Sequence, residues 1–363
     1  MMARILRGQV VALFAFDIGY EVSLEHLARI SSATPVQPLS RKRRTPTYMQ
    51  YSRPPVFLNL PAGEEFLGQA GIVQATVFDF GAVTIAYRWP LATDNQPLRL
   101  EQLAQVSSEL YSRNLEIQAR DEVIGLVDRI RPAIVRPELS ALVEDYYLFI
   151  IEQIEPILSA AELLKQYRLV LAQVLSFETS VLSQEQQDEL LGERMSYYEN
   201  DLTIIDWNAA IICDAEFEDA VAVLELLNVE LLEARWIDAL LDRRVDDYAS
   251  LVQQRPQWPL PLRAPYKRAV EELTELRLEY TLLAERVGNS LKLVGDLYLS
   301  RLHTAGVRRV HLPEWERIIR HKLQIMDELY DRLNDRVRTA QSQALELTII
   351  ALIVVEVFLA LFK

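Results

Sequence analysis

The hydrophobic and polar positions of the first 154 residues form strand-like runs separated by two helical stretches. Helical spacing predicts a short helix over residues 23–32 and a longer one over residues 98–130, interrupted near Gly125. Apolar or alternating runs predict strands at residues 8–16, 71–80, 82–89 and 145–154. This β-α-β-β-α-β order matches the split βαβ motif, so we expect an α+β fold with a ferredoxin-like domain over residues 1–156.

The pattern changes to mainly helical after Pro156. We expect a helical domain over residues 157–255, which contains a small β-hairpin at residues 201–214. A proline-rich break separates this domain from two long helices, and these form a predicted helical hairpin over residues 264–343. The long helical segments are predicted at residues 160–174, 184–198, 216–250, 265–302 and 313–362.

Apolar residues recur along the last predicted helix at alternating steps of four and three. This spacing is typical of a coiled-coil seam, because it keeps one apolar stripe facing a partner helix. We expect the preceding helix to be that partner in an antiparallel hairpin, with a second copy of the protein as the alternative. The seam residues are Ile319, Leu323, Met326, Tyr330, Leu333 and Val337, continuing to Ala340 and Ala344.

Residues 344–363 are apolar on every side of a helix. Between Leu347 and Phe362 the polar residues are Thr348 and Glu356. Twenty helical residues at about 1.5 Å each span roughly 30 Å, the thickness of the hydrocarbon core of a bilayer. We therefore expect a single C-terminal transmembrane helix, and the alternative is a core helix of a large soluble bundle or oligomer.

Two glutamates and the flanking charges bear on this membrane segment. Glu356 lies in the middle of it and Glu346 near its start. A carboxylate at bilayer depth costs roughly 2.5–3.5 kcal/mol, so Glu356 either hydrogen-bonds across a helix–helix contact or draws water locally. Arginines precede the segment, and the positive-inside rule then places residues 1–343 in the cytoplasm.

Composition excludes several functional classes. The net charge of −14 and the pI near 4.9 argue against binding of DNA through bulk electrostatics. Cys213 is the one cysteine, which excludes an intrachain disulfide and a cysteine-based zinc site. Glycine-rich phosphate loops and nucleophile-elbow motifs are absent from the sequence. We therefore expect a protein that is not an enzyme and that holds no metal and no cofactor.

Two charged clusters have a structural and a functional interpretation. Asp214, Glu216, Glu218 and Asp219 surround a predicted helix start, where favourable interaction with the helix dipole accounts for them better than a metal site does. A proline-flanked loop carries a basic run that would suit anionic lipid headgroups or RNA, or would form a solvated loop. This run is Arg41, Lys42, Arg43 and Arg44.

The C-terminal residues resemble a known signature. Residues 312–336 followed by 344–361 are similar to the coiled coil and apolar segment of the "required for meiotic nuclear division" family, and residues 77–89 resemble its strand pair, with Phe80 at a position often occupied by Tyr. The signature has the form L-E-x-x-I-I-x-L-I-x-x-E-[IV]. It is occupied by Leu345, Glu346, Ile349, Ile350, Leu352, Ile353, Glu356 and Val357.

This resemblance implies a distant bacterial-type member of a membrane-anchored family without established catalysis. Its mitochondrial members support translation in the organelle, which implies the ribosome as one possible partner. The resulting hypothesis is a membrane-tethered scaffold or adaptor that recruits a cytoplasmic protein partner and forms homo-oligomers. The alternatives are an enzyme or nucleotide-binding protein with a pocket in the α+β domain, and a self-assembling membrane oligomer.

Overall fold

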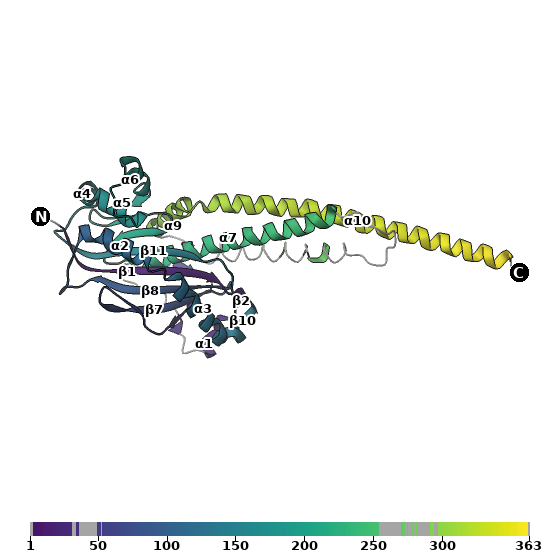
Figure 1. Ribbon diagram of the computed structural model, residues 1–363, viewed down its shortest axis with the longest axis horizontal. Helices are drawn as coiled ribbons and strands as arrows, with labels where there is room; N and C mark the ends of the chain where they lie inside the picture. The colour runs from purple at the N-terminus through teal and green to yellow at the C-terminus, as the bar shows by residue number, and fades with distance from the viewer. Residues whose placement is uncertain are drawn as a thin grey trace. The chain divides into compact units, whose positions relative to one another are not determined.

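The computed structural model describes most of the chain (Figure 1). Its contacts divide the chain into two units, Met1–Trp236 with Arg286–Pro313, and Ile237–Glu285 with Glu314–Lys363. The described residues are 3–30, 34–35, 49–51, 53–253, 270–272, 274, 278, 281, 291–293 and 297–361.

The centre of the first unit is an antiparallel sheet of four long strands (Figure 1). β1 (Arg4–Asp17) pairs on one side with β11 (Glu144–Glu155) and on the other with β8 (Ala82–Ala92), and β8 pairs with β7 (Gln69–Val77). The four strands predicted from the sequence are therefore present, and the mixed α+β class is confirmed.

The sheet of the described residues is wider than these four strands and contains 11 in total. The predicted hairpin is formed by β13 (Leu202–Ile205) and β14 (Ala209–Cys213), and β14 runs parallel to β11. The hairpin thus extends the same sheet.

The remaining strands of the sheet are β3 (Thr34–Pro35), β5 (Val56–Asn59), β6 (Gly63–Phe66), β9 (Leu98–Arg99) and β12 (Arg194–Met195). Two separate strand pairs are β2 (Gly19–Val22) with β10 (Ile134–Pro137), and β4 (Met49–Tyr51) with β15 (Leu291–Leu293).

Several helices break or end where the sequence pattern did not predict. The helical stretch over residues 98–130 is interrupted at Asn114, which has a φ of 52°, and Gly125 lies inside the second helix. The predicted helix over residues 160–174 breaks at Tyr167, and the one over 184–198 ends at Leu190.

The helices that precede α7 (Glu218–Gln253) are α1 (Leu24–Ile30), η1 (Leu100–Gln102), α2 (Leu103–Ser112), α3 (Glu116–Ile130), η2 (Arg131–Ala133), α4 (Ala160–Gln166), α5 (Arg168–Ser176) and α6 (Gln184–Leu190).

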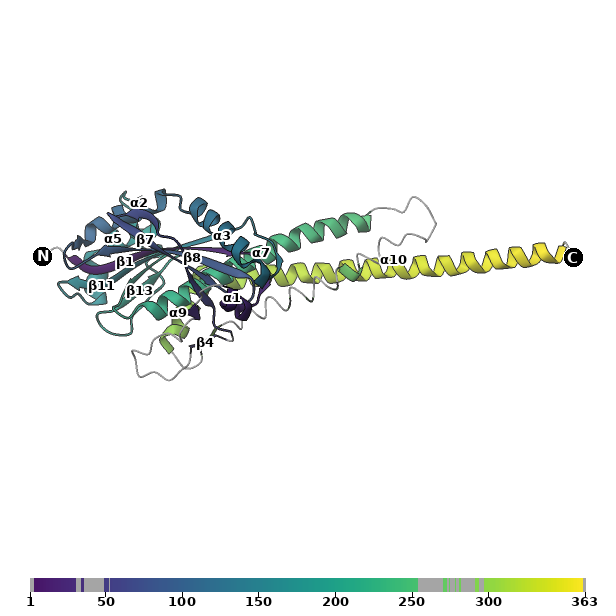
Figure 2. The ribbon, with the colours of Figure 1, turned by 90° about the horizontal axis from the view of Figure 1, so that it is seen from below.

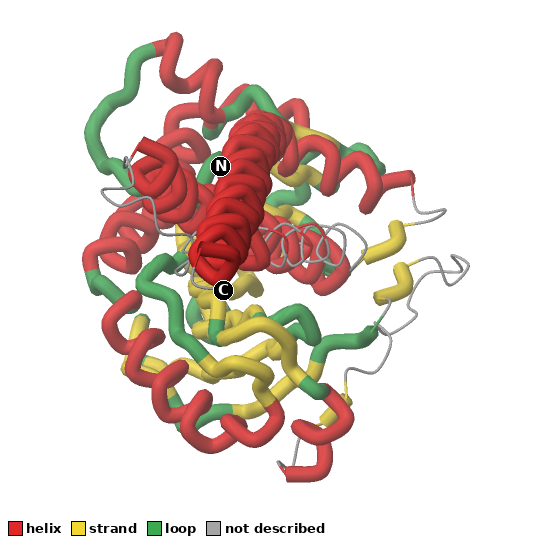
Figure 3. Tube along the Cα trace, turned by 90° about the vertical axis from the view of Figure 1, so that its right-hand side faces the viewer, coloured by secondary structure: helices red, strands yellow, loops and turns green. Residues whose placement is uncertain are grey.

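Residues of the central strands alternate between two covered faces. In β1, Phe14 and Phe16 join the main apolar core with α2, α3 and α5, because neighbouring side chains of a strand point to opposite faces. Leu13 and Asp17 point to the other face, which is covered by the first part of α7 (Glu218–Gln253). Helices therefore cover both faces of the strands (Figure 3).

The C-terminal helices differ in part from their predicted bounds. α10 (Leu312–Leu361) is one continuous helix, as predicted (Figure 2). Residues 303–312, expected to be a connector, instead belong largely to α9 (Leu297–Arg309), and Leu291, expected in a long helix, lies in β15. Most of the predicted helix over residues 265–302 lies outside the described residues.

Candidate functional site

The C-terminal third of α10 is an apolar helical surface without cover. Among the described residues, α10 is the helix that is long and apolar enough to cross a membrane, and no residue of its most apolar 18-residue window is buried. Leu345 is 66% exposed, and Leu352 and Leu359 are each 64% exposed. A core helix of a soluble protein would bury these side chains, so the exposure fits a segment that needs an apolar surrounding.

Both predicted membrane glutamates lie on this segment and are exposed. Glu346 is near its start, and Glu356 lies among apolar neighbours on every side of the helix. The Thr348 hydroxyl donates to the Ala344 carbonyl of its own helix at 2.8 Å, so this polar side chain is already satisfied. The Glu356 side chain is not satisfied in this way, so its environment depends on what surrounds the helix.

The predicted seam forms the buried stripe of α10. Ile319, Met326 and Leu333, which are seven residues apart, are buried, and Leu323, Tyr330 and Val337 are half-buried. On the same side the Lys322 ammonium donates to the Asp238 carboxylate at 2.6 Å and lies 2.7 Å from Asp242. Both aspartates belong to α7. Lys322, which lies beside the seam, therefore contacts α7. Most of the helix predicted to pack against the seam lies outside the described residues.

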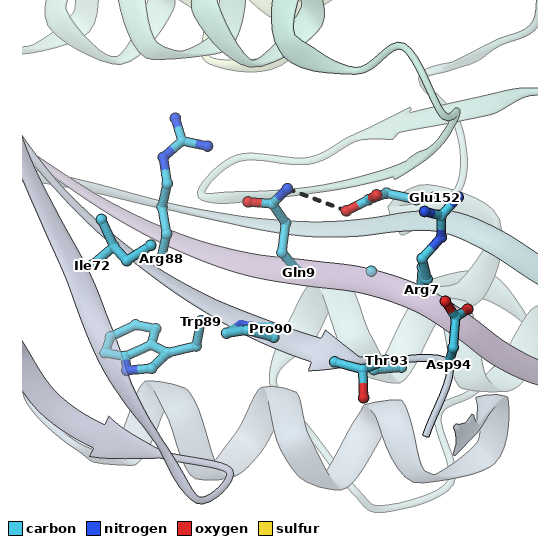
Figure 4. A pocket seen from close by; sticks show the side chains of 11 residues that line it. Arg7, Gln9, Ile72, Arg88, Trp89, Pro90, Thr93, Asp94 and Glu152 are labelled. Carbon is cyan, nitrogen blue, oxygen red and sulfur yellow. Dashed lines mark hydrogen bonds between the residues drawn. The ribbon is translucent and has the colours of Figure 1, made fainter. Parts of the chain in front are cut away.

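A groove of about 300 Å³ lies at one end of the central sheet (Figure 4). Figure 4 shows Gln9 and Arg88 projecting to one side of the strands and Trp89 to the other, and the Gln9 amide donates to Glu152 at 3.3 Å. Positive and negative side chains alternate along the groove, so its charges do not select an anion or a cation. The charged lining residues are Arg7, Arg88, Asp94 and Glu152.

Buried carboxylates occupy the contact between α7 and the sheet. The Thr84 hydroxyl of β8 donates to Glu225, and the Arg235 guanidinium donates to Glu144 at the start of β11. The Glu144 backbone carbonyl also accepts from the Asn228 amide at 3.0 Å. Burial raises the pKa of Glu144 to about 7, although the charge of Arg235 opposes this increase. These polar contacts fix the position of α7 on the sheet, since a buried polar group without a partner is costly.

Asp17 and Glu233 form the most strongly perturbed part of this contact. Burial, together with the Glu138 carboxylate, raises the pKa of Asp17 to about 8, while a hydrogen bond from the Gly19 backbone amide lowers it. Burial and the nearby Asp17 also raise the pKa of Glu233 well above its ordinary value. Both Glu233 oxygens are buried and have no hydrogen-bond partner among the described residues. Perturbed carboxyls are frequent at functional sites, but this pair does not line the groove described above.

α9 is held to the same unit by two charged contacts. The Arg309 guanidinium donates to the buried Asp206 carboxylate at 2.7 Å, and burial raises the pKa of Asp206. His303 lies 2.9 Å from Glu230 of α7. Burial lowers the pKa of His303, but the hydrogen bond and charge of Glu230 raise it by more. These contacts attach α9 to the sheet and to α7, and they are structural.

The other candidate residues from the sequence do not form a reactive site. Asp214 and Glu216 lie before α7, where the Glu216 backbone amide donates to the Asp214 carboxylate at 2.9 Å within the turn that leads into the helix. Burial raises the pKa of the Cys213 thiol to about 12, which keeps it unreactive. No group of three metal-ligating side chains occurs within the described residues. Arg41, Lys42, Arg43 and Arg44 lie outside them.

Sequence reasoning missed the carboxylates at the contact between α7 and the sheet. The missed residues were Asp17, Glu144, Glu225 and Glu233. A signal was present, because Glu225, Asn228, Glu230 and Glu233 are the polar residues of an otherwise apolar stretch of α7, residues 220–234. Such polar residues in a buried helix indicate polar partners on the neighbouring element.

Comparison with known proteins concerns mainly the sheet-containing part of the chain. Residues 7–220, more than half of the chain, match the family described as "Uncharacterized protein MJ0711, N-terminal domain". The chain is 27% identical over 202 residues to "Uncharacterized protein MJ0711" of Methanocaldococcus jannaschii, and this similarity covers 55% of the chain and 61% of that protein. The chain therefore spans less than two thirds of the relative's length.

The family match includes β1 to β14 and the first residues of α7, and the apolar segment of α10 lies beyond it. No solved structure matches the chain. On the match over residues 7–220, this chain belongs to the MJ0711 N-terminal domain family.

Proposed function

We propose that the protein is a membrane-tethered scaffold or adaptor, in which α10 anchors the chain and the α+β domain recruits a cytoplasmic partner. The observation that carries this proposal is the uncovered apolar surface of α10 from Leu345 to Leu359. Exposed to water, this surface would be an aggregation site, whereas a bilayer covers it completely.

Flanking charge supports one orientation of the proposed anchor. Arg332, Arg336 and Arg338 lie on α10 within about 15 residues of the apolar segment. The positive-inside rule then places the sheet-containing unit on the cytoplasmic side. This is the side on which a soluble partner would meet the α+β domain.

The central strands support a ferredoxin-like interpretation of that domain. Their spatial order, β11-β1-β8-β7 with antiparallel neighbours, corresponds to fourth, first, third and second strand of the split βαβ motif. The heptad spacing of Ile319, Met326 and Leu333 supports a coiled-coil packing of α10 with α7. Such a helical pair would set the distance between the domain and the bilayer.

The partner is a separate part of the proposal. The resemblance to a family linked with translation in organelles favours the ribosome, and the basic run Arg41–Arg44 would add attraction to RNA. A cytoplasmic protein bound through the α+β domain is the alternative partner. Cosedimentation of purified full-length protein with ribosomes, compared with a variant in which these four basic residues are replaced by Ser, distinguishes the two.

Carbonate extraction of membranes tests the anchor. We compare the full chain with a chain ending at Ala340 and with the double variant Leu352→Arg/Val355→Arg. The double variant keeps the length of α10 but adds two charges at bilayer depth, each costing about 3 kcal/mol. The control, Glu314→Arg/Glu316→Arg, introduces the same number of arginines at exposed positions near the start of α10, where they replace glutamates.

We expect the full chain and the control to remain in the membrane pellet, and the truncated and doubly charged chains to be released. Release of the full chain together with the variants would refute the anchor and with it the membrane scaffold.

A second candidate function rests on the groove. Its volume of about 300 Å³ is at the small end of ligand pockets, and its mixed charges would suit a small zwitterionic or nucleotide-like ligand. A ligand-dependent increase in the Tm of the full chain that is lost in Arg88→Met would favour this enzyme or ligand-binding alternative.

A further inference from the structure

Glu356 is the one polar residue between Ile349 and Leu361, and it lies in the middle of the apolar part of α10. Its side chain is exposed and has no hydrogen-bond partner among the described residues. If α10 spans a bilayer, as proposed above, this carboxyl lies at hydrocarbon depth, where an unsatisfied polar group costs several kcal/mol. A group of this kind needs a partner inside the membrane.

The side of α10 that packs on α7 cannot provide that partner. Lys322, which pairs with Asp238 and Asp242 of α7, and Leu333 mark this side of the helix. At about 100° per residue, Glu356 lies about 140° around the helix from Leu333. The carboxyl therefore faces away from the direction of the α7 contact, and a contact through Glu356 leaves the Lys322 contacts intact.

We propose that Glu356 joins two copies of this chain within the membrane by a hydrogen bond between their carboxyl groups. A second copy inserted in the same orientation places the same residue at the same depth, which another membrane protein would do only by coincidence. A neutral carboxylic acid carries one donor and free acceptor positions, so two of them satisfy each other. This proposal rests on the membrane anchor proposed above.

The residues around Glu356 define the contact face. Ile349 and Leu352 lie about 20° and 40° from Glu356 around the helix, whereas Leu347 and Val354 lie about 180° and 160° away. Ala360, one turn beyond Glu356, is small and lets the two backbones approach closely. The predicted interface is therefore one narrow side of α10.

Cysteine crosslinking of the full chain in phosphatidylcholine vesicles tests this face. The background is Cys213→Ala, which removes the chain's own buried cysteine. We expect disulfide-linked dimers with Ile349→Cys and Leu352→Cys, and at least several-fold less dimer with the matched controls Leu347→Cys and Val354→Cys. Equal crosslinking at all four positions would overturn the proposed face.

A second measurement tests the hydrogen bond itself. Energy transfer between donor- and acceptor-labelled full chains is followed in the same vesicles at several protein-to-lipid ratios. Glu356→Leu is expected to weaken association about tenfold, as the loss of one hydrogen bond in a membrane does. Glu356→Gln, whose amide both donates and accepts, is expected to retain most of the association, and Val354→Leu is the control for an apolar change on the other side.

Unchanged association of Glu356→Leu, or an equal loss for Glu356→Gln and Glu356→Leu, would overturn the proposal. Each sample is also extracted with carbonate. Failure of the wild-type chain to remain in the vesicles would refute the anchor, and a wild-type chain that remains in the vesicles without associating would refute the carboxyl pair alone.

Discussion

The Arg235 guanidinium of α7 donates to the Glu144 carboxylate at the start of β11, and the two side chains connect a helix to a strand 91 residues away in sequence. Glu144 is 7% exposed, whereas Arg235 keeps 35% of its side chain in contact with solvent. The pair therefore holds a buried carboxylate with a cation that is only partly desolvated.

Arg235→Met should lower the free energy of unfolding by about 2 kcal/mol. Loss of one partner of a buried ion pair costs about 3–5 kcal/mol, and solvent screening at the partly exposed Arg235 reduces this value. Urea unfolding followed by circular dichroism measures the change. Arg243→Met, on the exposed side of the same helix, should shift stability by less than about 0.5 kcal/mol. Equal effects of the two variants would show that the Glu144 contact contributes nothing.

Glu233→Leu should stabilise the protein by about 1–3 kcal/mol. Both Glu233 oxygens are buried without a hydrogen-bond partner among the described residues, and an apolar side chain removes this desolvation cost. The Tm from differential scanning calorimetry should increase. Glu230→Leu, on the same helix, should lower the Tm, because Glu230 is bound to His303 at 2.9 Å. A decrease with both variants would mean that Glu233 has a partner that stabilises it.

Stability should decrease as pH rises from about 4 to 8. The pKa of Asp17 is 3.8 when unperturbed and about 8 in the folded protein. In this window the unfolded chain has released the proton that the folded chain still binds, so each increase in pH favours unfolding, and the effect levels off above pH 8.

Glu144, with a pKa of about 7, contributes to the same slope. Asp17→Asn should therefore reduce the slope without removing it. Unfolding free energies at pH 5, 6.5 and 8 measure this, and identical slopes for wild type and Asp17→Asn would contradict the raised pKa.

Gly81→Ala should destabilise the fold by about 3 kcal/mol or more. Gly81 has a φ of +99°, and an added Cβ would lie 1.7 Å from the Gly19 carbonyl oxygen, so the backbone must move. Gly125→Ala is the matched control. It lies inside α3 with no atom within 4 Å of the added Cβ, and it should stabilise the protein by up to about 1 kcal/mol. Similar Tm values for the two variants would refute the close approach at Gly81.

Lys322→Met should weaken the packing of α10 on α7 by about 1–2 kcal/mol. Lys322 and Asp238 are each 15% exposed, so the substitution leaves a largely buried carboxylate without its cation. Limited proteolysis in detergent should show faster cleavage after residue 237. Asp242→Asn, at a position whose side chain is 60% exposed, should change the cleavage rate little. A larger effect of Asp242→Asn than of Lys322→Met would contradict the assigned burial.

Local patterns were sufficient to predict the helices and strands in which apolar residues recur at a regular spacing. Alternating or continuous apolar residues predicted the buried strands β1, β7, β8 and β11. The heptad spacing and the apolar end together predicted that α10 is one continuous helix. The two strands predicted at residues 71–80 and 82–89 leave Gly81 between them, and the structure places it in the turn between β7 and β8 with a positive φ, which favours glycine.

Helix breaks were less accessible to sequence reasoning. Gly125 was expected to interrupt a helix but lies inside α3, and the interruption falls at Asn114, where the chain turns to pack α2 and α3 separately against the sheet. Helix propensity is a weak signal compared with such packing.

The sequence by itself determined the α+β class, the four central strands and the apolar helix, because each depends on residues close together along the chain. Only the tertiary structure decided that β13 and β14 extend the central sheet, that Lys322 of α10 contacts α7, that Glu144 pairs with Arg235 and that Asp17 lies near Glu233 of α7. These relationships join residues far apart in sequence. Their side chains become neighbours only when the sheet and the helices pack together, and no local periodicity records which surfaces will meet.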